Sequence, residues 1–227
     1  MKGMVLTILM TLSWPMASAS PWVQKDGGFY TRLAIASEEV EGLQAYRGDI
    51  YGEYGLTDIW TLTGKVEAIA YEDASDFNAQ GWRATLRRKL FTRGAFTGSV
   101  EFGALQGAAI GGSNGCETLG AEMRGGAAWS GKVRKIDTFV FAEVVGRLHE
   151  DCRRERFEFG LGQRVTKNIW TITQVWVERG TQNAESDKLQ SELLWKGKIY
   201  DLSIGYRQEN GRQFDEQGIF VALAKRF

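Results

Sequence analysis

The absence of proline from residue 22 to residue 227 constrains the fold of this chain more than any other feature. Proline has no backbone N–H to donate to a β-ladder, so it is excluded from paired strands. Loops of a soluble protein of this length ordinarily contain prolines. The chain also has 28 glycines and 12% aromatic residues. This composition indicates one continuous antiparallel sheet whose strands are joined by short turns.

Apolar and polar residues alternate with the period of two that is typical of β-strands. Within residues 46–56, Tyr46 and Ile50 fall on one face, whereas Arg47 and Glu53 fall on the other. Strands of 9–11 residues tilted by about 45° are long enough to cross a bilayer. About twelve segments follow the pattern, over residues 28–40, 43–56, 59–73, 79–92, 95–108, 119–131, 135–149, 153–166, 169–181, 188–197, 199–209 and 216–227.

The connections between these segments alternate in length along the chain. TRGAF and KGKIY are short, whereas EDASDFNAQ and RGTQNAESDK are longer and more polar. Up-and-down barrels of outer membranes have short periplasmic turns and longer outer loops. We therefore predict an all-β, up-and-down antiparallel transmembrane β-barrel of about twelve strands. A lipocalin-like barrel or a periplasmic sandwich is the soluble alternative, because alternation by itself does not distinguish the inside from the outside.

The first twenty residues, MKGMVLTILMTLSWPMASAS, have the features of a signal peptide. Lys2 supplies the positive charge, residues 4–10 form a short apolar core, and residues 17–19 form an A-x-A cleavage site. The apolar core is shorter than the roughly 20 residues that a transmembrane helix needs. A buried N-terminal helix is the alternative. We predict a signal peptide over residues 1–19 and a single barrel domain over residues 20–227.

The chain ends on an alternating strand with Phe227 last and with Leu223, Val221 and Ile219 before it. In this the sequence resembles Gram-negative outer-membrane β-barrel proteins, whose last strand ends at Phe or Trp. Lys225 departs from the pattern, although a long side chain near the membrane edge can extend its charge to water. The resemblance implies location in the cell outer membrane and contact with its lipids and lipopolysaccharide. It also implies recognition of the last strand by the barrel-assembly machinery.

Aromatic residues cluster beside the short turns, at the level where rings favour the lipid headgroups. The alternative is that aromatic residues suit strands in general. Two related segments, LTDIWTLT (56–63) and VTKNIWTIT (165–173), each place a tryptophan after a short turn. They reflect either a six-strand duplication or one local solution used twice. The residues expected in this girdle are Trp60, Trp129, Trp170, Trp195 and Tyr200.

If the apolar faces meet lipid, the polar faces line the interior. Eight strands are filled by side chains and 16–18 leave a wide channel, so about twelve strands leave a modest bore. Long charged side chains of both signs should pair in such a bore. The residues expected to line it are Arg47, Asp49, Glu53, Lys65, Glu67, Arg83, Arg87, Glu101, Glu122, Arg124, Glu143, Arg147, Arg156, Glu158 and Arg207.

Two functions are compatible with this interior. One is a narrow, porin-like channel for small polar solutes, in which a group such as Arg83, Arg87 and Arg124 biases the passage locally towards anions. The other is a structural or surface-interaction barrel whose lumen is closed by salt bridges. The formal net charge is zero, with 28 basic and 28 acidic residues, which argues against nucleic-acid binding. No motif names a solute.

Catalytic chemistry has little support in the sequence. A lipid-modifying hydrolase needs a histidine beside a serine and a third polar group, but the single histidine, His149, has no serine beside it and no G-x-S-x-G motif occurs. We predict no enzyme activity, no cofactor and no metal site. Cys116 and Cys152 fall in two predicted outer loops, and export through an oxidising compartment makes them a candidate disulfide.

Overall fold

The computed structural model describes residues 21–111, 116–212 and 214–227. The predicted signal peptide, residues 1–19, lies outside the described residues and stays a prediction. Among the described residues, no helix is long and apolar enough to span a membrane.

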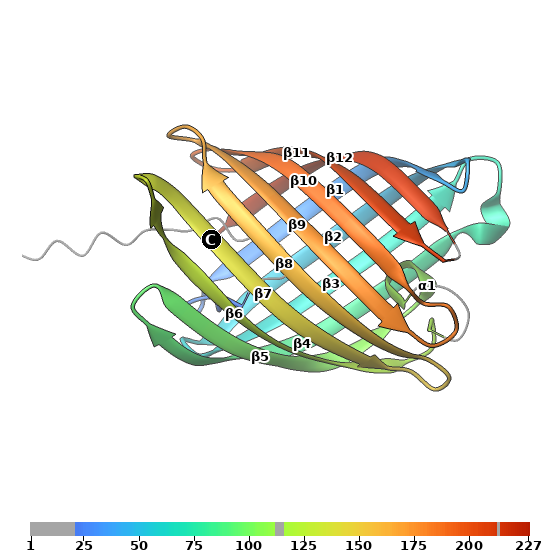
Figure 1. Cartoon of the computed structure of the whole chain (residues 1–227), viewed down its shortest axis with the longest axis horizontal. Helices are drawn as coiled ribbons and strands as arrows, with labels where there is room; N and C mark the ends of the chain where they lie inside the picture. The colour runs from blue at the N-terminus through green and yellow to red at the C-terminus, as the bar shows by residue number, and fades with distance from the viewer. Residues whose placement is uncertain (1–20, 112–115, 213) are drawn as a thin grey trace, which may run out of the picture.

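Twelve antiparallel strands form a closed barrel, in which each strand pairs with its neighbours in the sequence and β1 pairs with β12 (Figure 1). The predicted fold class is therefore confirmed. A one-turn 3-10 helix, η1 (Ser75–Phe77), and a one-turn helix, α1 (Ala108–Gly111), lie between strands. The strands are β1 (Phe29–Val40), β2 (Leu43–Thr57), β3 (Trp60–Tyr71), β4 (Ala79–Arg93), β5 (Phe96–Gln106), β6 (Gly120–Val133), β7 (Ile136–Leu148), β8 (Arg153–Arg164), β9 (Ile169–Gly180), β10 (Ser186–Lys196), β11 (Asp201–Gly211) and β12 (Asp215–Arg226).

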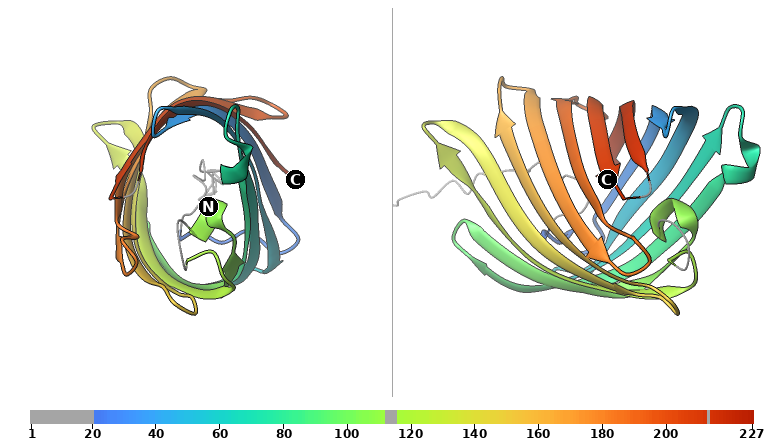
Figure 2. Two further views of the ribbon diagram at one scale, coloured as in Figure 1. Left: turned by 90° about the vertical axis from the view of Figure 1, so that its right-hand side faces the viewer. Right: turned by 45° about the vertical axis from the view of Figure 1, so that its right-hand side comes forward.

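The two ends of the barrel differ. We call the end with the β2–β3, β4–β5, β6–β7, β8–β9 and β10–β11 connections the short-turn end, and β1 starts and β12 finishes there. We call the opposite end, where η1 and α1 lie, the long-loop end. Figure 2 shows α1 at the mouth of the barrel in the view along its axis. The β1–β2 connection at the long-loop end is itself tight, with Glu41 and Gly42 both at positive φ.

The outer surface is apolar along every strand. Leu33 and Ile35 of β1, Phe157 of β8 and Val221 of β12 are each between 45% and 57% exposed. A surface of this kind suits lipid, because hydrocarbon offers no partner to polar groups and closure leaves no unpaired strand edge. The orientation that the alternation leaves open is thereby settled, with apolar side chains outside and ionised side chains inside.

The last strand closes the barrel against the first. Leu33 of β1 is paired with Leu223 of β12, and the Phe227 N–H donates to the Phe29 carbonyl at 2.9 Å. The rings of Phe29 and Phe227 lie 5.6 Å apart. The ammonium of Lys225 lies over the Phe227 ring, 4.1 Å from its centre. The departure at Lys225 thus adds a cation–π contact at the barrel edge.

Candidate functional site: a charged barrel interior

Every residue predicted to line the lumen lies on the inward-facing side of its strand. Most are under 9% exposed, and Lys65 and Arg156 are more open. Charges this deeply buried are expected to be paired and hydrogen-bonded. Three clusters of ion pairs in the described part of the interior take the names of their central residues, Arg47, Arg87 and Glu178.

The Arg47 cluster lies towards the long-loop end, on β12 and β1–β3. Arg47 donates to three carboxylates, those of Glu38 at 2.7 Å, Glu67 at 2.5 Å and Glu216 at 2.5 Å. Arg207 of β11 pairs with Glu38 and with Glu216. Three acids therefore surround one arginine, and the neighbouring basic residues balance their charge.

The Arg87 cluster lies towards the short-turn end. Arg87 of β4 is fully buried and donates to Glu53 at 2.9 Å and to Glu101 at 2.7 Å. Its Nη1 also donates to the carbonyl of Trp22 at 2.8 Å. The Tyr51 hydroxyl shares the Glu53 carboxylate. One guanidinium thus joins the barrel wall to the segment that precedes β1.

The Glu178 cluster lies at the long-loop end of β7–β9, and its charge ratio is the reverse of that at Arg47. The Glu178 carboxylate accepts from Arg154 at 2.8 Å, from Arg156 at 2.6 Å and from Arg147 at 3.5 Å. Arg147 also donates to Glu122 of β6 at 2.7 Å. Three arginines therefore surround one acid.

Glu122 links the Glu178 cluster to the middle of the barrel. Its carboxylate also pairs with Arg124 at 3.0 Å and with Arg83 at 3.5 Å. Arg124 continues the chain of ion pairs to Glu143 at 3.1 Å. Glu158, directly opposite Glu143 on β8, accepts a hydrogen bond from the Gln174 amide at 3.4 Å.

The N-terminal segment, residues 21–28, enters the barrel at the short-turn end. The Trp22 ring packs edge-on against Phe139 of β7, with the ring centres 5.6 Å apart. The Gln24 N–H donates to the Thr61 hydroxyl of β3 at 2.8 Å, and the Gln24 side chain donates to Glu53 of β2. Since β7 lies four or five strands from β2 and β3 in the barrel order, this segment bridges opposite walls.

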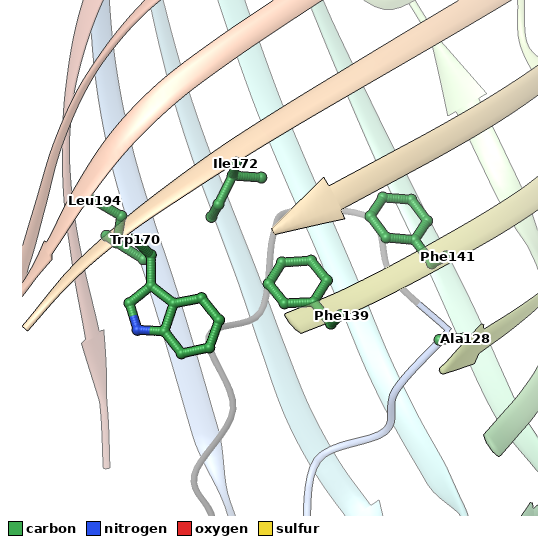
Figure 3. Close-up of a cluster of buried hydrophobic side chains, with 6 residues drawn as sticks. All are labelled: Ala128, Phe139, Phe141, Trp170, Ile172 and Leu194. Atoms are coloured by element: carbon green, nitrogen blue, oxygen red, sulfur yellow. The ribbon is translucent and has the colours of Figure 1, made fainter. Parts of the chain in front are cut away.

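An aromatic patch on the inner wall receives Trp22. Phe139 and Phe141 lie over Gly162 and Gly160 of the neighbouring strand, where an added Cβ would come within 2.1 Å of each ring. Glycine is required there because any side chain would occupy the space of the ring. Figure 3 shows the patch, which comprises Ala128, Phe139, Phe141, Trp170, Ile172 and Leu194.

Trp170 corrects the predicted girdle. Its side chain is 5% exposed and belongs to the inner patch, with its ring 6.0 Å from that of Phe139. The physical reason is register, because residues 170, 172, 174 and 178 of β9 all face inward. Trp60 packs against Phe102, an outward residue. The two similar segments 56–63 and 165–173 therefore place their tryptophans on opposite faces.

The other girdle residues lie on the outer side. Trp195 and Tyr200 are 51% and 47% exposed. Trp129 is paired across the strands with the exposed Phe96.

Several inward charges were missed by the sequence prediction, and most lie near the long-loop end. They are Glu38, Arg154, Glu178, Glu209 and Glu216. The alternation gives a signal for two of them, because Arg154 and Glu209 have the same parity as the predicted inward residues Arg156 and Arg207 of their own strands.

The long-loop end is tied by a disulfide. Cys116, which precedes β6, is bonded to Cys152, which precedes β8, as predicted. His149 lies beside this link, and its Nδ1 contacts the carbonyl of Thr118 at 2.8 Å. The ring packs against Gly120, where a Cβ would lie 2.6 Å from Nδ1. The contacts of His149 are those of a residue that anchors the loop.

Within residues 21–111, 116–212 and 214–227, no group of three or more His, Cys, Asp or Glu side chains is arranged to hold a metal ion.

Comparison with known proteins connects the chain to outer-membrane barrels at the level of the fold. No protein-family model and no curated protein sequence matches the chain. An outer-membrane channel from Pseudomonas putida F1 is similar, with a TM-score of 0.60 and 10% identity over 94% of this chain and 100% of that one. The KdgM porin has a TM-score of 0.59 and 10% identity over 84% and 97% of the two chains. LpxR from Salmonella typhimurium has a TM-score of 0.56 and 8% identity over 86% and 99%. The architecture is therefore that of an outer-membrane β-barrel.

Proposed function

We propose that this protein is a narrow channel for small polar solutes in the outer membrane of a Gram-negative bacterium. The observation that carries the proposal is the small number of strands that separates the two partners of each inward ion pair. Among the described residues, the inward ion pairs join strands that are at most two apart in the barrel, except for Arg32 of β1 with Glu192 of β10, which are three apart. The opposite wall is six strands away, so the charged side chains line the wall rather than span the bore.

A lining of this kind suits the passage of polar solutes. Lys65 and Arg156, the more open of the residues predicted to line the lumen, present donors to a hydrated solute, and charges along a channel set its selectivity. A purely structural lumen has no need of charge, because an apolar core of the same volume is often as stable as a buried ion pair. The KdgM porin and the Pseudomonas channel share this fold, which supports the proposal by analogy.

The N-terminal segment is held across the short-turn end by contacts with several strands. Trp22 is held by the aromatic patch and its carbonyl by Arg87, so the segment is fixed at two walls. We assign this segment the role of a gate. The exterior is expected to contact outer-membrane lipids and lipopolysaccharide, and the last strand, ending at Phe227, is expected to be the part that the barrel-assembly machinery recognises.

A closed structural barrel is the second candidate, and the bridging N-terminal segment favours it. Single-channel recording in planar bilayers separates the two. We expect conductance steps from the wild type and a several-fold higher open probability from Trp22→Ala, which removes the ring contact with β7. Trp195→Ala, on the outer surface, is the matched control and should behave as the wild type. Silence from both the wild type and Trp22→Ala would leave the closed barrel as the function.

Enzyme activity is not part of the proposal. The Nδ1 of His149 is held by a backbone carbonyl, and its Nε2 has no hydrogen-bond partner among the described residues, so no serine hydroxyl is bonded to this ring as an activated nucleophile would be. Release of fatty acid from phospholipid or lipopolysaccharide, lost in His149→Ala, would show that this assignment is mistaken.

A further inference from the structure

The wall formed by β4 and β6–β9 at the long-loop end has more arginines than carboxylates. Arg83, Arg147, Arg154 and Arg156 pair there with two acids, Glu122 and Glu178, and Glu122 is shared with Arg124 as well. A carboxylate can neutralise one guanidinium, so two acids leave positive charge among these four arginines, which the nearby Glu158 of β8 offsets only in part.

Arg154 has an unused binding edge. Its Nη1 donates to Glu178, whereas its Nε and Nη2 have no hydrogen-bond partner among the described residues. Arg154 is 3% exposed, and a buried donor without a partner is costly. The Nε and Nη2 donors lie in the guanidinium plane and point outward from the same edge. This is the geometry that binds two oxygens of a carboxylate or a phosphate.

Arg156 opens this cluster to the lumen. It shares the Glu178 carboxylate with Arg154 through its Nε, and its side chain is 23% exposed, against 4% for Arg154. An anion in the lumen would therefore meet Arg156 first, and the unpartnered donors of Arg154, which are buried behind the same carboxylate, would become its second contact once they are uncovered.

The opposite wall has no such capacity. Arg47 is enclosed by three carboxylates, and Arg207 is shared between two of them. An anion approaching that wall meets bound arginines and repelling acids. The half of the lumen towards the long-loop end thus has an anion-attracting wall on β7–β9 and a neutralised wall on β12 and β1–β3.

We propose that Arg154 and Arg156 form a binding site for the carboxylate or phosphate group of a small anionic solute. This inference rests on the proposed channel and gives its solute class. The predicted arginine group Arg83, Arg87 and Arg124 is not the site, because Arg87 is enclosed by Glu53 and Glu101.

The site is tested by calorimetric titration of the detergent-solubilised barrel with inorganic phosphate and, separately, with acetate. We expect saturable binding of at least one of the two anions, and their relative affinities identify the preferred group. Arg154→Gln and Arg156→Gln should each weaken binding at least tenfold. Arg153→Gln, the adjacent residue on β8 with an outward side chain that is 68% exposed, loses the same charge and should bind as the wild type.

The heat-modifiable shift of the folded barrel on a gel checks that each variant is folded. If Arg154→Gln does not fold, Arg156→Gln and Arg156→Lys decide the question. The lysine variant keeps the charge but loses the second donor, so its affinity for the anion should lie between those of the wild type and Arg156→Gln. Absence of binding in the wild type, or equal binding in wild type and Arg156→Gln, would overturn the site.

Failure of the site and failure of the channel give different results. Conductance without anion binding would refute the site and leave the channel intact. Binding without conductance would refute the channel and keep the site. With both present, the reversal potential in a potassium chloride gradient should favour chloride in the wild type and shift towards potassium in Arg156→Gln.

Discussion

Replacing Arg87 by methionine should destabilise the barrel more than any exposed substitution. The variant removes a fully buried guanidinium and leaves the carboxylates of Glu53 and Glu101, which are 2% and 1% exposed, without the cation that they share. Breaking a buried pair by removing one partner costs about 3–5 kcal/mol. The lost donor to the Trp22 carbonyl adds about 0.5–1.5 kcal/mol. We expect the free energy of unfolding to fall by about 3.5–6.5 kcal/mol.

Urea unfolding of the barrel in lipid vesicles, followed by tryptophan fluorescence and by gel mobility, measures this loss. Arg88→Met is the matched control, because Arg88 is the next residue, faces outward and contacts the Trp60 ring from 5.4 Å. An exposed cation–π contact contributes about 0.5–1 kcal/mol, so the control should lose no more than that.

A second variant distinguishes the cost of unpaired buried carboxylates from the cost of lost packing. Arg87→Met combined with Glu101→Gln removes one of the two carboxylates that the single change leaves unpaired. The double variant should therefore be more stable than Arg87→Met alone, although it carries more changes. If Arg87→Met lies within about 1 kcal/mol of the wild type, or if the double variant is the less stable, the argument that Arg87 neutralises buried carboxylates is refuted.

Three further changes test other parts of the barrel. Gly162→Val places a Cβ 2.1 Å from the ring above it and should cost about 1–3 kcal/mol in urea unfolding, whereas Gly146→Val, with no atom nearer than 4.0 Å, should cost less. Cys116→Ser with Cys152→Ser opens a link across 36 residues; chain entropy assigns it about 3–4 kcal/mol, and equal urea midpoints would contradict that value. Burial lowers the pKa of His149 in the folded barrel, so the unfolded chain binds a proton at this residue more readily below about pH 6.5. The free energy of unfolding should therefore fall on acidification. Between pH 7.5 and 5.5 the His149→Gln variant should lose less stability than the wild type.

The wall of the barrel could be predicted from the sequence because it depends on a local rule. Side chains alternate between the two faces of a strand, so assigning the apolar face to lipid fixes the direction of the side chains on each strand whose two faces differ in polarity. The predicted segment 153–166 became Arg153–Arg164, and 216–227 became Asp215–Arg226. Errors at the ends are small because turns interrupt the alternation sharply.

The same rule fails where both faces of a strand are mixed. In β9, tryptophan and isoleucine face inward at positions 170 and 172, and threonine faces outward at 171 and 173. Composition there favours the wrong face. The inward ring of Trp170 is stabilised by the ring of Phe139 on β7, 6.0 Å away, and this contact is not local in sequence.

The pairing of charges was also beyond the sequence. Alternation identifies Glu67 and Arg47 as inward, but the ion pair of Arg47 with Glu216 depends on the closure of β12 onto β1. The imbalance at Glu178 depends in the same way on the register of β7, β8 and β9. Ion-pair partners follow from register, and register is a property of the assembled sheet.

The arrangement of the interior separates solute choice from gating. Arg154 and Arg156 lie near the long-loop end of β8, whereas Trp22 meets Phe139 near the short-turn end of β7. The two groups share no hydrogen bond or ion pair among the described residues, and effects of sites without shared partners usually add. Trp22→Ala should therefore raise the open probability and leave the reversal potential unchanged. Arg156→Gln should shift the reversal potential and leave the open probability unchanged. A reversal potential that moves in Trp22→Ala would mean that the segment in the bore, rather than the arginine wall, selects the solute.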